Sequence, residues 1–143
     1  MILAQPVMPG VLDYLDTARQ RGISLAVASS SSSSWVYGHL TRLGLLDYFS
    51  CLRTSDDVRH AKPDPELYLS ALKCLDIPAH EALAFEDSPH GITAAKQAGL
   101  YCVAVPNDLT RRLETGHADL TLNSLLDMSL EQLMERANNH SVP

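Results

Sequence analysis

An acidic turn between an apolar run and a helical segment constrains the fold of this chain most strongly. Residues 82–85 are apolar, and Glu86 and Asp87 follow them directly. Ser88 and Pro89 then open a segment of helical composition. Because serine is favoured at a helix N-cap and proline at the first helical position, the pattern predicts a strand, a tight turn and a helix. Two carboxylates are therefore expected at the carboxyl end of a strand, where open α/β sheets bind their ligands.

The adjacent Glu86 and Asp87 allow two interpretations. Carboxylate oxygens suit Mg²⁺, which needs one or two carboxylates and retains several waters. Alternatively, both residues only turn the chain and help to cap the helix. Polar residues at other strand ends are needed to decide between the two.

The rest of the chain alternates short apolar runs with amphipathic segments of about ten residues, a pattern typical of a parallel sheet covered by helices. We therefore predict an α/β fold with a doubly wound, mostly parallel sheet in one domain over residues 1–143. The expected strands are 23–28, 50–53, 82–85, 101–105 and 118–122, and the expected helices are 11–21, 35–43, 65–75, 89–98 and one that Ser129 caps.

Six consecutive serines, Ser29 to Ser34, follow the predicted strand 23–28. By composition alone this run is typical of a linker. Its position between a strand and a helix instead places Ser29 at a strand tip, where its hydroxyl and the backbone N–H groups could bind an anion. Ser33 or Ser34 is then expected to cap the helix, and a capped loop without any ligand remains the alternative.

Lys62 stands in a stiffened segment, since Pro63 and Pro65 follow it and fix an extended entry into the next helix. Such a lysine is either an ordinary surface residue or a cation held near the ends of the strands. Its neighbours in space decide between these interpretations.

Composition excludes several classes of function. The net charge of -6 and the pI near 5.4 argue against nucleic acid as a partner. No apolar run approaches the ~18 residues of a membrane span. Cys51, Cys74 and Cys102 match no CxxC pattern, and each lies in an apolar context typical of a buried thiol, which favours a reducing cytoplasm.

Three segments, taken in order, resemble the haloacid dehalogenase-like superfamily, most closely its β-phosphoglucomutase-like subgroup. They are residues 25–31, 61–65 and 85–91 (LAVASSS, AKPDP and FEDSPHG). The resemblance implies a Mg²⁺-dependent phosphatase or phosphomutase acting on a small phosphorylated metabolite, such as a sugar phosphate. It implies that Ser29 and Ser30 bind the phosphoryl group, that Lys62 neutralises its charge, and that Asp87 and Glu86 hold Mg²⁺ directly or through water.

The chain departs from this family at its N-terminus. The family's nucleophilic aspartate lies in a DxDxT or DxDG motif, which this sequence lacks; Asp13 and Asp16 have the wrong spacing. The resemblance therefore implies a C-terminal part of the core, without its first strand and helical cap, and inactive by itself. Two alternatives are a non-catalytic phosphate-binding or partner-binding remnant and, less in keeping with the acidic turn, a metal-independent 2-haloacid dehalogenase.

A missing first strand would leave a gap in the middle of the sheet, since in the family it separates the strand that ends before Ser29 from the one that ends at Glu86. Unpaired strand edges invite another chain. We expect a bound partner segment or self-association to fill the gap rather than Met1–Val7, because Pro6 and Pro9 make a poor central strand.

Overall fold

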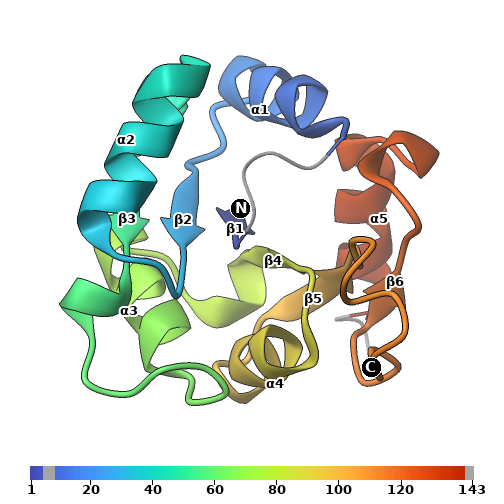
Figure 1. The fold of residues 1–143 in the computed structure, drawn as a ribbon. Helices are drawn as coiled ribbons and strands as arrows, with labels where there is room; N and C mark the ends of the chain where they lie inside the picture. The colour runs from blue at the N-terminus through green and yellow to red at the C-terminus, as the bar shows by residue number, and fades with distance from the viewer. Residues whose placement is uncertain (5–8, 141–143) are drawn as a thin grey trace.

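The fold is a parallel six-stranded sheet with helices on both faces (Figure 1). The computed structural model describes residues 1–4 and 9–140. The strand order is β3-β2-β1-β4-β5-β6, and every neighbouring pair is parallel. The strands are β1 (Ile2–Leu3), β2 (Ala26–Ala28), β3 (Cys51–Arg53), β4 (Leu83–Glu86), β5 (Tyr101–Ala104) and β6 (Leu120–Thr121).

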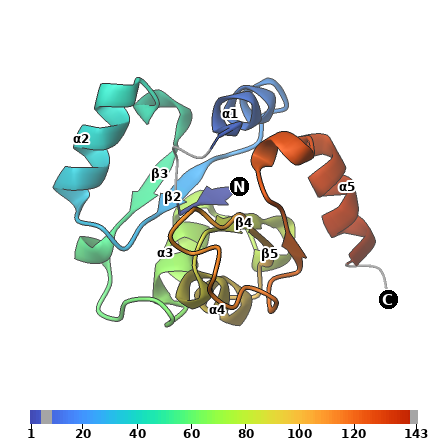
Figure 2. The same ribbon diagram turned by 45° about the vertical axis from the view of Figure 1, so that its right-hand side comes forward.

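Five α-helices cover the sheet in the described part of the chain. Helices α1, α2 and α5 lie on one face, and α3 and α4 lie on the other (Figures 1 and 2). This arrangement confirms the predicted doubly wound α/β fold. Their bounds are α1 (Val11–Gln20), α2 (Ser33–Leu43), α3 (Glu66–Leu75), α4 (Pro89–Gln97) and α5 (Leu130–His140); the 3₁₀ turns are η1 (Leu46–Tyr48), η2 (Ser55–Asp57), η3 (Ala79–Glu81) and η4 (Leu125–Asp127).

The buried strands alternate their side chains between two cores. Leu25 and Val27 pack with α1, α2 and α5, whereas Ala26 and Ala28 pack with α3 and α4. Both sets are apolar, as strands buried on two faces require. Among the described residues, no helix is long and apolar enough to cross a membrane.

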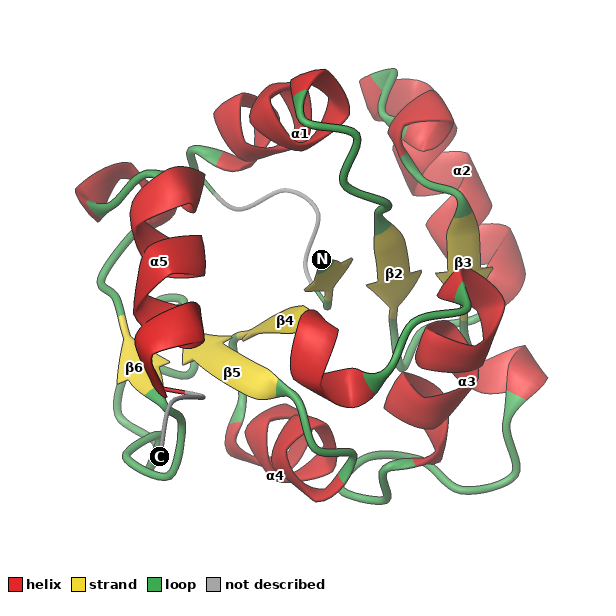
Figure 3. Ribbon diagram, turned by 180° about the vertical axis from the view of Figure 1, so that it is seen from behind, coloured by secondary structure: helices red, strands yellow, loops and turns green. Residues whose placement is uncertain are grey.

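Strand β1 occupies the centre of the sheet, where we expected a gap. It pairs with β2 on one side and with β4 on the other, and Figure 3 shows it between them from behind. Ile2 and Leu3 are both fully buried, one in each core. The expectation that a partner segment or a second copy fills this place is therefore wrong. The central strand consists of only two residues, and both precede Pro6. The argument that proline makes a poor central strand therefore did not apply to them. Pro6 itself lies outside the described residues.

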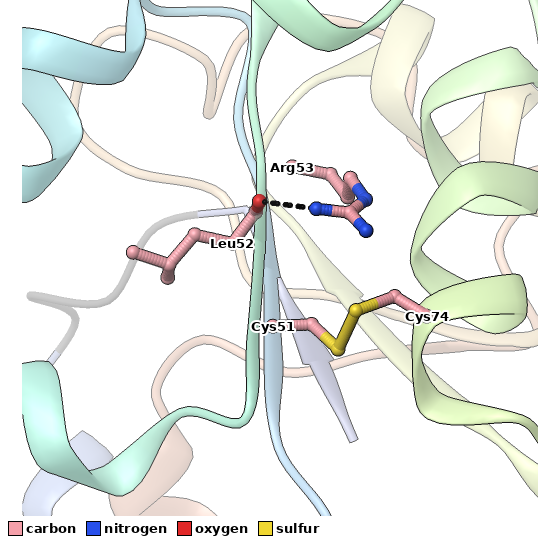
Figure 4. The surroundings of a disulfide bond; sticks show 4 residues. All are labelled: Cys51, Leu52, Arg53 and Cys74. Carbon is pink, nitrogen blue, oxygen red and sulfur yellow. Dashed lines mark hydrogen bonds between the residues drawn. A yellow bond between two sulfur atoms is a disulfide. The ribbon is translucent and has the colours of Figure 1, made fainter.

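Cys51 and Cys74 form a disulfide bond, which corrects the expectation of three buried thiols. Figure 4 shows the bond joining β3 to α3. It forms because α3 packs on β3 and brings the two Cα atoms to 6.2 Å, although 23 positions separate them in sequence. Cys102 is a free, buried thiol, as expected. The cysteines therefore no longer argue for a reducing compartment.

Serine hydroxyls cap three of the helices. The Ser88 hydroxyl accepts from the Gly91 N–H, and Ser129 accepts from the N–H of Gln132, both at predicted caps. For α2 the cap is Ser32, which accepts from the N–H of Trp35, rather than Ser33 or Ser34. The helix thus begins earlier in the serine run than we predicted.

Candidate functional site

Lys62 joins the ends of two strands. Its ammonium group donates to the carbonyl oxygen of Ala28 at 3.0 Å and to Oε1 of Glu86 at 2.5 Å. Ala28 is the last residue of β2 and Glu86 the last of β4. Although Lys62 lies in a loop between β3 and α3, its side chain is only 8% exposed. Lys62 is therefore not a solvated surface lysine. It links the strand end that precedes Ser29 to the strand end that precedes Asp87.

The carboxylate of Glu86 is turned into the protein. Its side chain is 1% exposed, and Oε1 also accepts a hydrogen bond from the Tyr68 hydroxyl at 2.5 Å. A Cβ on Gly91 would overlap both of its oxygens. Burial and the adjacent carboxylate raise the pKa of Tyr68 well above its ordinary value, so the phenol keeps its proton and remains a donor. Glu86 is thus held by Lys62, Tyr68 and the backbone of α4.

Asp87 is the second acidic residue of the turn and has different surroundings. It is buried, and its Oδ2 accepts a hydrogen bond from Nδ2 of Asn107 at 3.0 Å. Its pKa is raised above the ordinary value, because desolvation outweighs the opposing effects of a backbone hydrogen bond, the Lys62 charge and the Asn107 hydrogen bond. A buried carboxylate whose charge is only partly compensated is a group that a cation would stabilise.

The serine run forms a loop at the end of β2. Ser29 is buried, and its hydroxyl accepts from the N–H of Ser31 at 3.1 Å. Ser30 is exposed. The Ser29 N–H is already bonded to the Arg53 carbonyl at 3.0 Å, so the hydroxyl rather than this amide remains for a ligand.

A second set of hydrogen bonds holds the far end of the serine loop. The hydroxyls of Ser33 and Thr54 lie 2.5 Å apart, and the Ser33 N–H donates to Asp56 at 2.8 Å. The serine run is therefore a bonded loop and not a flexible linker.

The donor set fits a cation at Asp87 better than at Glu86. Mg²⁺ retains several waters and needs only one or two carboxylates from the protein. Asp87 offers one carboxylate at the carboxyl edge of the sheet. Glu86 has both oxygens against protein groups, so it could reach an ion only through water.

Two residues of this arrangement were not singled out from the sequence. Tyr68 sits on the buried face of an amphipathic helix, where an aromatic residue is typical of core, so no sequence signal marks its hydrogen bond. Asn107 follows β5 closely. A polar residue just past a strand is the same signal that marked Ser29 and Asp87, and it would have found Asn107.

A separate group of possible metal ligands has a structural role in the loop between β3 and α3. His60, Asp64 and Glu66 place ligand atoms within 4.8 Å of one another. However, Glu66 already accepts hydrogen bonds from the N–H groups of Arg59 and His60 and from the His60 ring, and Asp64 accepts from the N–H of Glu66. These bonds close the loop that carries Lys62, which accounts for the cluster without a metal.

Comparison with known proteins supplies an independent assignment. The model of the family described as haloacid dehalogenase-like hydrolase matches residues 4–105. The protein YhcW of Bacillus subtilis (strain 168) is 44% identical over 138 residues, which cover 96% of this chain and 63% of that protein. Validoxylamine A 7'-phosphate phosphatase of Streptomyces hygroscopicus subsp. limoneus is 36% identical over 132 residues, covering 87% of this chain and 61% of the relative.

Solved structures agree in fold and in extent. The crystal structure of CbbY from Rhodobacter sphaeroides in complex with phosphate matches with a TM-score of 0.84 and 37% identity, over 88% of this chain and 58% of that one. A β-phosphoglucomutase from Clostridium difficile matches with a TM-score of 0.84 and 25% identity, over 99% and 61%. The chain thus spans 54% to 63% of the length of the first curated relatives.

Proposed function

This chain belongs to the haloacid dehalogenase-like hydrolase family, and from that premise we propose that its site binds the phosphoryl group of a small phosphorylated metabolite together with Mg²⁺. The observation that carries the proposal is the placement of Lys62, whose buried ammonium group joins the ends of β2 and β4. A cation fixed at the carboxyl edge of a parallel sheet suits a phosphate better than a neutral ligand.

Each side chain has a distinct part in this proposal. The hydroxyls of Ser29 and Ser30 donate to phosphoryl oxygens, and Lys62 supplies positive charge beside them. Asp87 is the direct carboxylate ligand of the metal, oriented by Asn107, and Glu86 reaches the metal only through water. When bound, Mg²⁺ would neutralise phosphoryl charge, on which phosphoryl transfer largely depends.

Hydrolysis needs one group more. Family members attack the phosphoryl group with an aspartate of a DxD motif, and this sequence has no such motif. We propose that residues 1–143 alone bind phosphate but do not turn over a phosphomonoester, because charge neutralisation without a nucleophile lacks the covalent step. In a longer protein that supplies the aspartate, the same site would act as a phosphatase or phosphomutase, with a sugar phosphate as the proposed substrate.

A second candidate is a phosphate-binding protein without catalysis, favoured by the missing motif. Its site would use the same Ser29, Lys62 and Asp87. The two candidates differ only in whether an upstream nucleophile completes the site. The cytoplasm is proposed as the compartment for either, since a phosphorylated metabolite is the proposed ligand.

Calorimetric titration with inorganic phosphate, with and without Mg²⁺, tests the proposal. We expect binding that Mg²⁺ strengthens, that Asp87→Asn weakens about tenfold or more, and that Asp76→Asn leaves unchanged. Asp76 is a matched control because it is an exposed carboxylate at the C-cap of α3. Absence of phosphate binding would contradict the proposed function. Mg²⁺-dependent hydrolysis of p-nitrophenyl phosphate by the chain alone, lost in Asp87→Asn, would show that a nucleophile had been missed.

A further inference from the structure

We propose that the Cys51–Cys74 disulfide is a redox modification site that controls the order of the loop carrying Lys62. The bond joins the edge of the sheet to a helix: among the described strands, β3 lies at the edge and pairs with β2 alone, and α3 packs against it. Lys62 lies between the two cysteines in sequence. The disulfide therefore closes a covalent ring that contains the cation of the proposed site.

The ring contains a segment with little regular structure of its own. Between η2 and α3, residues 58–65 form neither helix nor strand. They are held by the bonds of Glu66 to the backbone of Arg59 and His60 and by the contacts of Lys62. Because the disulfide fixes both ends of the ring, it restricts the open states of this segment, and its loss allows more of them.

Accessibility of the two sulfurs sets the direction of reduction. Cys51 is buried, whereas Cys74 is half-buried at the end of α3. A thiolate from outside therefore reaches Cys74 first. The Arg53 side chain lies on the same face of β3 as Cys51, as Figure 4 shows, and its guanidinium donates to the carbonyl oxygen of Leu52.

The proposed reactant is a dithiol reductant, either small or carried by a protein. One thiolate of the reductant attacks Sγ of Cys74 and forms a mixed disulfide, while Cys51 leaves as a thiolate and takes up a proton. The second thiol of the reductant then attacks the mixed disulfide, which releases Cys74 as a thiol. The protein disulfide is reduced to two thiols, and the dithiol is oxidised to its own disulfide.

The third cysteine provides an internal control. Cys102 lies on β5, outside the ring, and is fully buried. Burial raises the pKa of its thiol, so it stays protonated and unreactive. Any redox effect that requires Cys102 therefore does not belong to the proposed site.

The first measurement asks whether the bond forms in solution. Protein purified without reductant is denatured and alkylated, then analysed by mass spectrometry, with and without prior dithiothreitol. We expect alkylation of Cys102 alone in the untreated sample and of all three cysteines after reduction. Three alkylated cysteines in protein that has been incubated with oxidised glutathione would overturn the proposal.

Hydrogen–deuterium exchange then measures the order of the ring. In the reduced protein we expect amide exchange in residues 55–65 to rise about tenfold or more, and to return when the protein is reoxidised. Exchange in α4, which lies outside the ring, should not change. The variant with Cys51→Ala and Cys74→Ala should match the reduced protein whether or not reductant is present, and Cys102→Ala should match the wild type. Equal exchange of residues 55–65 in both redox states would overturn the proposal; if the double variant does not fold, the reduced wild type gives the same comparison.

The consequence for the site rests on the proposed function and is measured separately. Titration with inorganic phosphate and Mg²⁺ should show severalfold weaker binding to the reduced protein, because Lys62 is then less well positioned. Equal affinity in both states would overturn this consequence. A protein that binds no phosphate in either state, yet changes its exchange in residues 55–65 on reduction, would contradict the proposed function and support the redox site.

Discussion

The carboxylate of Glu86 occupies the space that a side chain on Gly91 would need. Glu86 ends β4 and Gly91 lies in the first turn of α4, so the helix can approach the strand end only because residue 91 has no Cβ. Glu86 is thus confined by Gly91 as well as by its hydrogen bonds from Lys62 and Tyr68.

Replacing Gly91 by alanine should therefore be strongly unfavourable. The new methyl group would displace the carboxylate or push α4 from the sheet, at a cost of about 1–3 kcal/mol in the free energy of unfolding. Gly38→Ala is the matched control: Gly38 also lies in a helix, but a Cβ there meets nothing within 4 Å, so a gain of up to ~1 kcal/mol is expected. Urea denaturation of both variants measures the difference, and equal effects would refute the steric argument.

The buried pair of Lys62 and Glu86 should show strong energetic coupling. Either Lys62→Met or Glu86→Gln leaves its partner charged and buried, which typically costs about 3–5 kcal/mol. The double variant should lose much less stability than the sum of the losses in the two single variants, because neither charge then remains. A double-mutant cycle by chemical denaturation measures the coupling. The exposed pair of Asp108 and Arg111 serves as a control in which no coupling is expected, and additivity at Lys62 and Glu86 would contradict a buried ion pair.

Asp87 should reduce stability at neutral pH. Burial raises its pKa, so the folded protein keeps this proton to higher pH than the unfolded chain does. The free energy of unfolding therefore falls as the pH rises from the pKa of Asp87 in the unfolded chain to its higher pKa in the folded protein. We expect Asp87→Asn to stabilise the protein by about 0.5–2 kcal/mol at pH 7, with the gain vanishing as the pH falls through that interval. Thermal denaturation across pH measures this, and a variant less stable than the wild type at pH 7 would count against the argument.

Strand β1 should contribute measurably to stability in spite of its length. Leu3 is fully buried, so Leu3→Ala is expected to cost about 2–5 kcal/mol. Leu12→Ala removes the same atoms from a side chain that is 51% exposed, and its effect should stay within about 0.5 kcal/mol. If both substitutions have equally small effects on the denaturation midpoint, residues 1–4 do not occupy the centre of the sheet in solution.

Sequence reasoning succeeded at two strand ends where a polar residue interrupts an apolar run, although it passed over the same signal at Asn107. Ser29 and Glu86-Asp87 were placed at strand ends because a buried strand must be apolar and its carboxyl end need not be. The caps Ser88 and Ser129 followed from local chemistry in the same way, because each bonds an N–H only three residues ahead. Such features depend on neighbours in sequence, and the sequence displays them directly.

The features that escaped prediction depend on tertiary packing. Two residues of β1 carry no periodic pattern, and their place is determined by the edges of β2 and β4. The disulfide required knowing that α3 packs on β3. The inward turn of Glu86 required the position of Tyr68, whose buried hydroxyl looks like any core aromatic in the sequence.

The shortness of β1 has a mechanical consequence. On each side, its registered pairs number only two: Ile2 and Leu3 with Ala26 and Val27, and with Ala84 and Phe85. Among the strands that the structure describes, only this narrow ladder joins a block of β2 and β3 to a block of β4, β5 and β6. A force that pulls β3 away from β5 would meet fewer registered pairs beside β1 than between β2 and β3 or between β4 and β5. The sheet would therefore separate along β1 into two blocks, with Lys62 bonded to a strand end on each side.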